Sequence, residues 1–326
     1  MPSTRFGAGI LALGFFGLSL IRCDQATAAE AWPQRTVNLI VPIGSGSGPD
    51  LAARIYAERL AARWKQPVVV ENRTGAEGLI AVAVFAAMHD DHTLLFSPAA
   101  PITVYPYTQQ KITYDPNRDL VPISSAANTF GAIAATLSTN VHTVAELIGF
   151  ARAHPNSLNW ATGGGAFPLL FAGFAKRAKL ELTRVSYRQQ NLAIQDLAEG
   201  RIHLFATTIT ALMPLAEAGK IRLLTVTNKT RAPIAPDIPT AIEAGHPELE
   251  FDGLTGFFGW RDMPAALRDR IASDVRAIAA EPHVAERLAK AGQIAHAGSP
   301  EEFARAIDEQ RARMAAIAAL LEKVDP

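Results

Sequence analysis

The sequence predicts an α/β fold, because short apolar segments typical of strands alternate with segments that have helical periodicity. The chain of 326 residues, with 49% apolar and 19% charged side chains, is long enough for two domains of ordinary size. We expect strands at residues 37–42, 68–72, 93–97, 120–125, 130–137, 158–162, 181–187, 202–207 and 221–226. We expect helices after the first strand and at residues 79–88, 144–154, 169–178, 191–199, 212–219 and 265–324.

The first strand leads directly into a glycine-rich turn and then a helix. The turn is Gly44-Ser45-Gly46-Ser47-Gly48, and residues 51–61 after it carry an apolar stripe at helical spacing. Pro49 suits the first turn of a helix because it has no N–H to leave unpaired there. The negative charge of Asp50 is favoured near a helix N-terminus, and we assign this residue mainly a structural role in ordering the turn.

Two further glycine-rich turns follow the strands at residues 68–72 and 158–162. They are Gly75-Ala76-Glu77-Gly78 and Gly163-Gly164-Gly165, and each is followed by a helical segment. The start of a helix leaves backbone N–H groups unpaired, and glycine lets a ligand approach them closely. Because none of the three turns contains Lys or Arg, they predict an anion site made of neutral donors. Glu77 would repel an anion, so we expect it to point to solvent.

Other known glycine motifs do not match these turns. A dinucleotide fingerprint needs G-x-G-x-x-G, and a phosphate loop needs Lys followed by Ser or Thr after its last glycine, but Gly48 is followed by Pro49-Asp50. A nucleophile elbow needs serine at its centre, where this chain has Gly46. The remaining alternative is that the glycines only form tight turns.

The N-terminus predicts export. Arg5 precedes an uncharged apolar run at residues 7–21, and Ala26-Thr27-Ala28 has the small-x-small pattern of a signal-peptidase site. We therefore expect residues 1–28 to be a cleavable signal peptide and the protein to act in the periplasm; an uncleaved anchor is the alternative. Cys23 is the single cysteine and precedes the cut, so the mature chain would have no disulfide and no thiolate ligand.

The charge balance argues against nucleic acid as a partner. The chain has 31 Lys and Arg side chains and 31 Asp and Glu side chains, which leaves no basic surplus. A metal or other cofactor is not expected, because the histidines have no workable ligand spacing. The group His89, Asp90, Asp91 and His92 is better explained as an exposed turn.

The blocks around the first two turns resemble the Bug (TctC-like) family of periplasmic receptors of tripartite tricarboxylate transporters. They are residues 37–50 and 68–78. Further matching blocks lie at residues 93–95, 114–116, 144–147, 218–222, 236–240 and 243–245. The resemblance covers essentially all of the chain after the predicted signal peptide.

The resemblance implies a periplasmic-binding-protein fold with two α/β domains, two crossovers and a ligand cleft that closes by a hinge motion. Domain 1 would comprise residues 33–100 and 225–326, and domain 2 residues 101–224. The receptor would hold a small carboxylate through backbone N–H groups, often with ordered water, and present it to membrane transporter subunits. It would act as a monomer and not as an enzyme. A receptor that delivers its ligand-bound form to a two-component signalling protein is the alternative.

The expected ligand-binding residues lie in the three turns and at strand ends beside them. They are Ile43, Gly44, Ser45, Gly46, Ser47, Gly48, Asp50, Gly75, Ala76, Gly78, Ser97, Ala99, Gly164, Gly165, Ala166, Phe167, Gln189 and Thr207. Two positions depart from the family pattern, since apolar Ala166-Phe167 follows the third turn and Thr207 stands where many relatives have aspartate. We therefore expect a carboxylate ligand with an apolar or aromatic end.

Overall fold

The first half of the fold is built on a six-stranded mixed sheet. In the computed structural model, which describes Met1 and residues 32–88, 90–109 and 111–322, residues 33–326 form one compact unit. The strand order is β11-β4-β10-β3-β1-β2. The strands are β1 (Val37–Val41), β2 (Val68–Asn72), β3 (Thr93–Pro98), β4 (Leu120–Thr129), β10 (Gly253–Trp260) and β11 (Gln293–Ala295). Apart from Met1, the predicted signal peptide lies outside the described residues.

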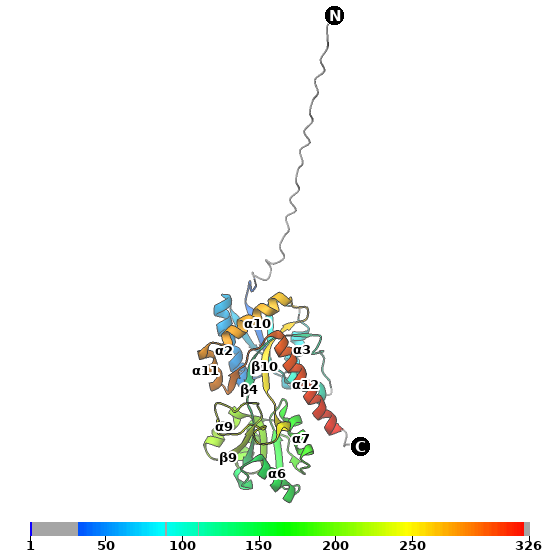
Figure 1. Cartoon of the computed structure of the whole chain (residues 1–326), viewed down its shortest axis with the longest axis vertical. Helices are drawn as coiled ribbons and strands as arrows, with labels where there is room; N and C mark the ends of the chain where they lie inside the picture. The colour runs from blue at the N-terminus through cyan, green and yellow to red at the C-terminus, as the bar shows by residue number, and fades with distance from the viewer. Residues whose placement is uncertain (2–31, 89, 110, 323–326) are drawn as a thin grey trace. The chain divides into compact units, whose positions relative to one another are not determined.

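The second half is built on a five-stranded sheet in the order β7-β6-β8-β5-β9. Its strands are β5 (Gly131–Thr136), β6 (Asn159–Thr162), β7 (Thr183–Arg184), β8 (Leu204–Thr208) and β9 (Ile221–Val226). Side chains alternate between the two faces, as in β8, where Leu204 and Phe205 are both fully buried but belong to different apolar clusters. Figure 1 shows the two sheets one above the other.

Helices cover both sheets and confirm the predicted α/β fold. Those of the first half are α2 (Gly48–Trp64), α3 (Leu79–Ala86), α4 (Ala100–Thr103), α5 (Tyr105–Thr108), α10 (Ala265–Ala279) and α11 (Pro282–Lys290). Those of the second half are α6 (Val144–Ala153), α7 (Phe167–Arg177), α8 (Gln190–Ala198) and α9 (Ile209–Glu217). Short 3-10 turns lie at η1 (Ala76–Gly78), η2 (Leu137–Thr139) and η3 (Pro247–Leu249).

The chain crosses between the sheets twice, and the two crossings are bonded to each other. Phe130 alone separates β4 from β5, and the return segment runs from Thr227 to β10. The Asn228 side chain accepts from the Gly131 N–H at 3.1 Å and donates to the Thr129 carbonyl at 3.1 Å, so it bridges the first crossing. The Thr227 N–H donates to the Gly131 carbonyl at 2.9 Å.

Sheet membership changes the expected domain boundaries. The sequence-based prediction places residues 101–224 in the second domain, but β4 belongs to the first sheet, where it pairs with β10 from Leu120 to Thr129. The boundary at residue 100 is therefore corrected for β4, because its backbone bonds lie in the first sheet. The division into two domains as units stays a prediction, since residues 33–326 form one compact unit.

Helix α12 (Pro300–Glu322) packs against both halves of the fold (Figure 1). Phe303 and Ile307 near its start belong to the apolar cluster of the first sheet. Met314 and Ile317 further along belong to the cluster formed with α6, α7 and the second sheet. The five buried positions from Phe303 to Ile317 recur at spacings of three and four, which places them on one stripe of the helix.

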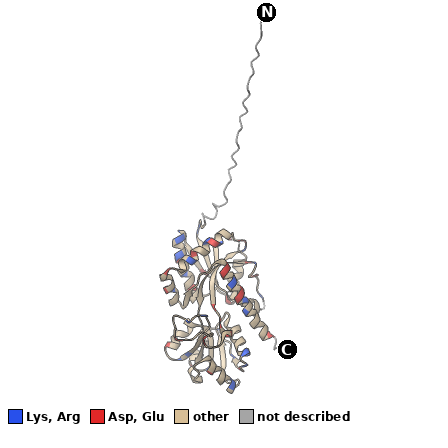
Figure 2. Cartoon of the chain, viewed as in Figure 1, with Lys and Arg blue, Asp and Glu red and all other residues tan. Residues whose placement is uncertain are grey.

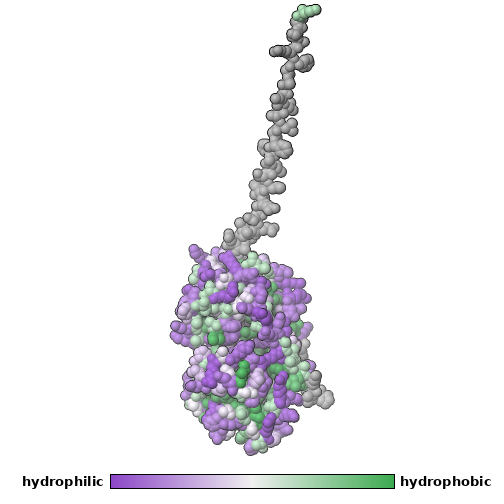
Figure 3. All heavy atoms as spheres, in the orientation of Figure 1, coloured by the Kyte–Doolittle hydropathy of each residue, from purple (hydrophilic) through white to green (hydrophobic). Residues whose placement is uncertain are grey.

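Charged and apolar side chains are mixed over the surface of the described residues. Charged side chains of both signs are interspersed on the helices, including α10 and α12 (Figure 2). The face in Figure 3 is mostly hydrophilic, with small scattered hydrophobic patches. Among the described residues, no helix combines the length and the apolar character needed to cross a bilayer.

The contact of α12 with α7 predicts the effect of a single added methyl group. A Cβ on Gly173 of α7 would lie 2.5 Å from the Ile317 Cγ2 atom. We expect Gly173→Ala to lower the free energy of unfolding by about 1–2 kcal/mol in urea titrations, because overpacking outweighs the gain in helix propensity. Gly149→Ala is the matched control in α6, where no atom lies within 4 Å of the added Cβ, and it should stabilise by about 0.5–1 kcal/mol. Equal effects of both changes would contradict tight packing at α12.

Candidate functional site

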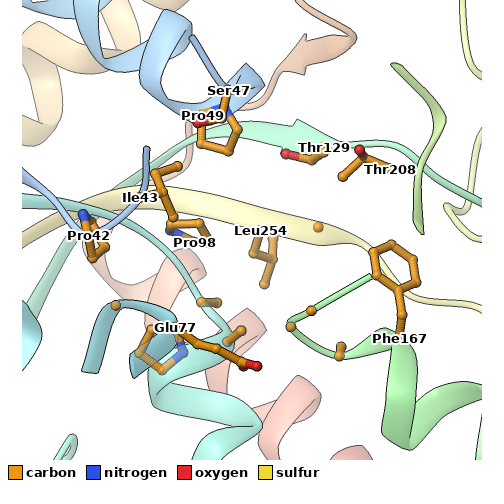
Figure 4. Close-up of a pocket in the computed structure, with 18 of the residues that line it drawn as sticks. Pro42, Ile43, Ser47, Pro49, Glu77, Pro98, Thr129, Phe167, Thr208 and Leu254 are labelled. Atoms are coloured by element: carbon orange, nitrogen blue, oxygen red, sulfur yellow. The ribbon is translucent and has the colours of Figure 1, made fainter. Parts of the chain in front are cut away.

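A cavity of about 450 Å³ lies where the glycine-rich turns meet the two crossings of the chain. Its lining comes from the β1–α2 and β2–α3 turns, the end of β3, helix α5, the crossings and the turn before α7. The lining residues are Pro42, Ile43, Gly44, Ser47, Pro49, Thr74, Gly75, Glu77, Gly78, Pro98, Ala99, Ala100, Pro101, Tyr105, Thr129, Gly131, Gly164, Gly165, Ala166, Phe167, Thr208, Phe251, Gly253, Leu254 and Gln310. Figure 4 shows Ser47 and Pro49 on one side of this space and Glu77 and Phe167 on others.

The first turn is shaped by the buried carboxylate of Asp50. Its oxygens accept hydrogen bonds from the Gly46 N–H at 2.8 Å, from Asn72 Nδ2 at 2.7 Å and from Arg54 Nε at 3.1 Å. Asn72 ends β2 and also donates to the Ile43 carbonyl at 3.0 Å, so the ends of β1 and β2 are held together. Burial raises the pKa of Asp50, but these hydrogen bonds and the charge of Arg54 lower it to a net value below its usual range.

This network decides which parts of the first turn face the cavity. Ile43, Gly44 and Ser47 line it, whereas the Gly46 N–H is already donated to Asp50. Ser45, Gly46, Gly48 and Asp50 are outside the lining, and Gly48 packs against the Gln293 side chain on the other side. Their expected contact with a ligand stays a prediction that this geometry does not favour.

The second turn has an unusual backbone. Ala76 and Glu77 both have positive φ values, 45° and 55°, and Gly78 follows with φ 93°. A Cβ on Gly78 would lie 2.8 Å from the Pro42 carbonyl oxygen, so only glycine fits there. Gly75 and Gly78 line the cavity, as does Glu77, whereas Ala76 does not.

Glu77 is exposed, as expected, but it faces the cavity rather than the outer surface (Figure 4). Its carboxylate extends toward the third turn, since a Cβ on Gly164 would lie 3.9 Å from Glu77 Oε1. Burial raises the pKa of the Tyr105 hydroxyl, and the charge of Glu77 and a hydrogen bond to it raise that pKa further. Tyr105 therefore stays protonated, and its hydroxyl lies close to the Glu77 carboxylate and to the Gly165 N–H.

The third turn is held from behind by β8 and α8. The Gly163 N–H donates to the Ala206 carbonyl at 2.9 Å, and Thr207 Oγ1 donates to Gln190 Oε1 at 3.0 Å. A Cβ on Gly163 would lie 2.5 Å from Thr207 Oγ1, so glycine is required for this close approach. The next four residues, Gly164 to Phe167, line the cavity.

Three expected site residues at strand and helix ends lie outside the lining. Ser97 of β3 is fully buried, and its neighbour Pro98 lines the cavity instead. In β8 the same holds for Thr207 and its neighbour Thr208. Consecutive side chains of a strand point to opposite faces, so a difference of one residue moves the side chain away from the cavity. Gln189 is exposed and also outside the lining, while Ala99 is part of it.

The sequence does not point to several of the lining residues, because they lie at places in the chain that no local motif marks. Thr129, Gly131, Phe251 and Gly253 flank the two crossings, so their place follows from the topology. Tyr105 and Gln310 come from helices without a glycine signal. The place of Thr208 in the lining could have been found from the sequence, because side chains of a strand alternate between its two faces and Thr207 is buried.

The described lining is almost free of charge. Glu77 is its only ionisable carboxylate, and it contains no Lys, Arg or His. The Arg54 side chain, which is the cation nearest to the first turn in the network above, donates to Asp50 and Asn72 behind the turn. The cavity therefore offers neutral donors at the first and third turns and a single negative group at the second.

The Asp90, Asp91 and His92 group brings three ligand-type atoms within 4.8 Å of one another. Arg35 pairs with both carboxylates, Thr93 Oγ1 donates to Asp90 at 2.6 Å, and the two ring nitrogens of His92 contact Asp91 and the Gln34 N–H. These contacts tie the group into the fold through ion pairs and hydrogen bonds. His89 lies outside the described residues.

The fold and the cavity together define a two-lobed solute-binding protein. Residues 52–322 match the model of TctC, the tripartite tricarboxylate transporter family receptor. The chain therefore belongs to this family, which consists of periplasmic binding proteins and not of enzymes.

The similarity to known proteins extends over nearly the whole length of the chain. It is 30% identical over 295 residues to the UPF0065 protein in the tcbD-tcbE intergenic region of Pseudomonas sp. (strain P51), covering 88% of each chain. The structure of R. palustris Rpa4515 with adipate has 31% identity and a TM-score of 0.76, with 89% of this chain and 98% of that one covered. MatC from Rhodopseudomonas palustris, with bound malate, has 25% identity and a TM-score of 0.74 over 88% of this chain and 100% of that one.

The network around Asp50 predicts a pH-dependent loss of stability. We expect Asp50→Asn to lower the free energy of unfolding by about 2–4 kcal/mol at pH 7, because an amide does not replace the buried carboxylate as an acceptor. The folded-state pKa of Asp50 is lowered, so its contribution is fully present above the unfolded pKa of about 3.9 and is lost as pH falls through the folded value. The difference between wild type and variant should therefore shrink between about pH 5 and pH 2.

Urea unfolding at a series of pH values measures this difference. Asp269→Asn is the matched control, because Asp269 is exposed and its one ion-pair partner among the described residues is Arg268, and its effect should stay within about 0.5 kcal/mol. A difference between wild type and Asp50→Asn that does not change with pH would contradict the assignment.

Proposed function

We propose that this receptor captures a small carboxylate in the cavity and presents it to the membrane subunits of a tripartite transporter. The single observation that carries this proposal is the cavity itself, which combines a glycine-rich turn at the start of α2 with a lining that contains no cation. Helix starts and backbone N–H groups satisfy a carboxylate without a salt bridge. Carboxylates bound by the similar proteins, adipate in Rpa4515 and malate in MatC, support the same ligand class.

The carboxylate would bind at the first turn. Gly44 lines the cavity there, and its backbone N–H has no hydrogen-bond acceptor within the described part of the chain, whereas Gly164 of the third turn lies beside the Glu77 carboxylate. Gly46 is excluded as a donor because its N–H is bonded to Asp50. Ordered water would complete the coordination, as is common where a polar ligand meets backbone donors.

The rest of the ligand would be apolar or aromatic. Beyond the turns, the cavity is lined by Ile43, Pro98, Leu254, Phe251 and Phe167. Phe167 also packs at the crossing, where a Cβ on Gly131 would lie 2.6 Å from its ring. Burial of apolar ligand surface against these side chains would supply binding free energy of about 25 cal/mol per Å².

Closure of the cleft would take place at the crossings. The first crossing is the single residue Phe130, and Asn228 and Thr227 of the return segment bond to the residues on either side of it. Paired connections of this kind are typical of hinges, in which a few residues absorb the change in backbone angles. The protein would bind its ligand as a monomer, because residues of one chain line the whole cavity.

A thermal-shift screen of the mature protein tests the ligand class. Carboxylates with apolar or aromatic groups should raise Tm, and a ligand at a hundredfold its Kd should add about 2.7 kcal/mol to the free energy of unfolding. Sugars and basic amino acids serve as the comparison sets and should leave Tm unchanged. A response confined to either of these sets would overturn the proposal.

The apolar part of the site predicts a selective effect of Phe167→Ala. Affinity for aromatic or long-chain carboxylates should fall by about tenfold in isothermal titration, because part of their buried apolar surface is lost. Affinity for acetate or propionate should change by less than about threefold, since they do not reach this side chain. Phe150→Ala in α6 is the matched control away from the lining and should affect neither group. An equal loss for all carboxylates would show that Phe167 only maintains the fold.

A further inference from the structure

Glu77 holds an unusual place among the residues of the cavity. It is the one carboxylate in the described lining, and it takes part in no ion pair among the described residues. The neighbouring Arg73 pairs with Glu71 instead, at 2.7 Å. A negative charge thus stands in a site whose other groups favour an anion.

The backbone keeps Glu77 in this position. Its φ of 55° follows a φ of 45° at Ala76, so two successive residues with side chains adopt the left-handed region that glycine occupies freely. Strain of this kind persists where the surrounding structure holds it, and it is concentrated at functional sites. Gly78, which must be glycine because of Pro42, fixes the end of the same turn.

The side chain is oriented toward the opposite wall of the cavity. Tyr105 is 4% exposed, so its protonated hydroxyl is fixed in place, and it interacts with both Glu77 and the Gly165 N–H. The Glu77 carboxylate also approaches Gly164, as the distance of 3.9 Å from a Cβ at that position shows. A ligand that extends from the first turn toward Tyr105 therefore meets a negative charge.

We infer that Glu77 is a specificity-determining residue that restricts the site to monocarboxylates and rejects a second carboxylate. The inference rests on the proposed function, because it takes one ligand carboxylate at the glycine-rich turns as given. A second ligand carboxylate within about 6 Å of Glu77 would weaken binding by roughly a hundredfold at an effective dielectric constant of 20. Water in the cavity screens part of this repulsion, so we expect at least about tenfold.

This selectivity would distinguish the protein from its structural relatives. Adipate and malate, the ligands in the structures of Rpa4515 and MatC, each carry two carboxylates. A monocarboxylate with an apolar end fits the lining here, because it adds no charge near Glu77 and places its apolar part against Phe167 and Leu254.

Isothermal titration with matched pairs of ligands tests the inference. The pairs are butyrate and succinate, hexanoate and adipate, and octanoate and suberate, which differ in each case only in the second carboxylate. For each pair of ligands that fits in the cavity, the wild type should bind the monocarboxylate at least about tenfold more tightly than the dicarboxylate. In Glu77→Gln the ratio should fall to within about threefold, mainly because the dicarboxylate binds more tightly.

Two further variants separate the charge of Glu77 from its structural role. Glu77→Gly removes the side chain at a φ that glycine adopts without strain, and it should give the same loss of selectivity as Glu77→Gln. Glu71→Gln is the control, since it removes a nearby carboxylate that is outside the lining, and it should keep the wild-type ratio.

The outcomes distinguish this inference from the proposed function. Tight binding of dicarboxylates by the wild type, or an unchanged ratio in both Glu77 variants, would overturn the role of Glu77 while leaving carboxylate capture intact. Binding of no carboxylate by the wild type or either Glu77 variant would overturn carboxylate capture and the inference with it.

Discussion

The buried carboxylate of Asp50 is the constraint on which the architecture of the site depends. It has no exposed surface, and it joins the turn after β1, the end of β2 and the first turn of α2 through three donors. A buried charge is stable only when it is paired and hydrogen-bonded, so these three segments are held in one arrangement. The same network turns Arg54 away from the cavity. One ion pair behind the turn therefore accounts for both the rigidity of the cavity wall and the neutrality of the surface it presents.

If the neutral wall binds the ligand carboxylate as proposed, selectivity would come from the opposite side of the cavity. Backbone N–H groups attract any carboxylate and do not distinguish one chain from another. Discrimination then has to come from groups that vary in charge and bulk, which here are Glu77 and the apolar side chains near Phe167. Under the proposed function, the anion site and the groups that select the ligand would lie on different segments of the chain, so that either could change without the other.

The sequence was sufficient to predict the α/β fold, strands β1 to β9 and the three turns, because apolar periodicity and glycine are local signals. It did not predict β10, and β11 lies inside the segment 265–324 that was expected to be helical. It was less informative where the outcome depends on distant contacts. The membership of β4 in the first sheet follows from pairing with β10, more than a hundred residues later, and no local pattern encodes that partner. The sequence points to Ser97 and Thr207, whereas the following residues, Pro98 and Thr208, line the cavity. Which side chains of a strand face the cavity depends on how the strand is set in its sheet. The orientation of Glu77 was unpredictable for a similar reason, since it depends on Tyr105 and on a turn from the other half of the fold.

Helix α12 has a mechanical consequence. It contacts the clusters of both halves, and its Gln310 lines the cavity while donating to the Asp252 carbonyl at 2.8 Å and accepting from Thr103 Oγ1 at 2.7 Å. Because α12 and the crossings lie on the same side of the cavity wall as connections between the halves, a hinge motion would part the halves at the edge away from this helix. Under the proposed function, the ligand would enter and leave through that one opening. A partner that held the halves apart there would release the ligand directly toward itself, so recognition and unloading would be a single event.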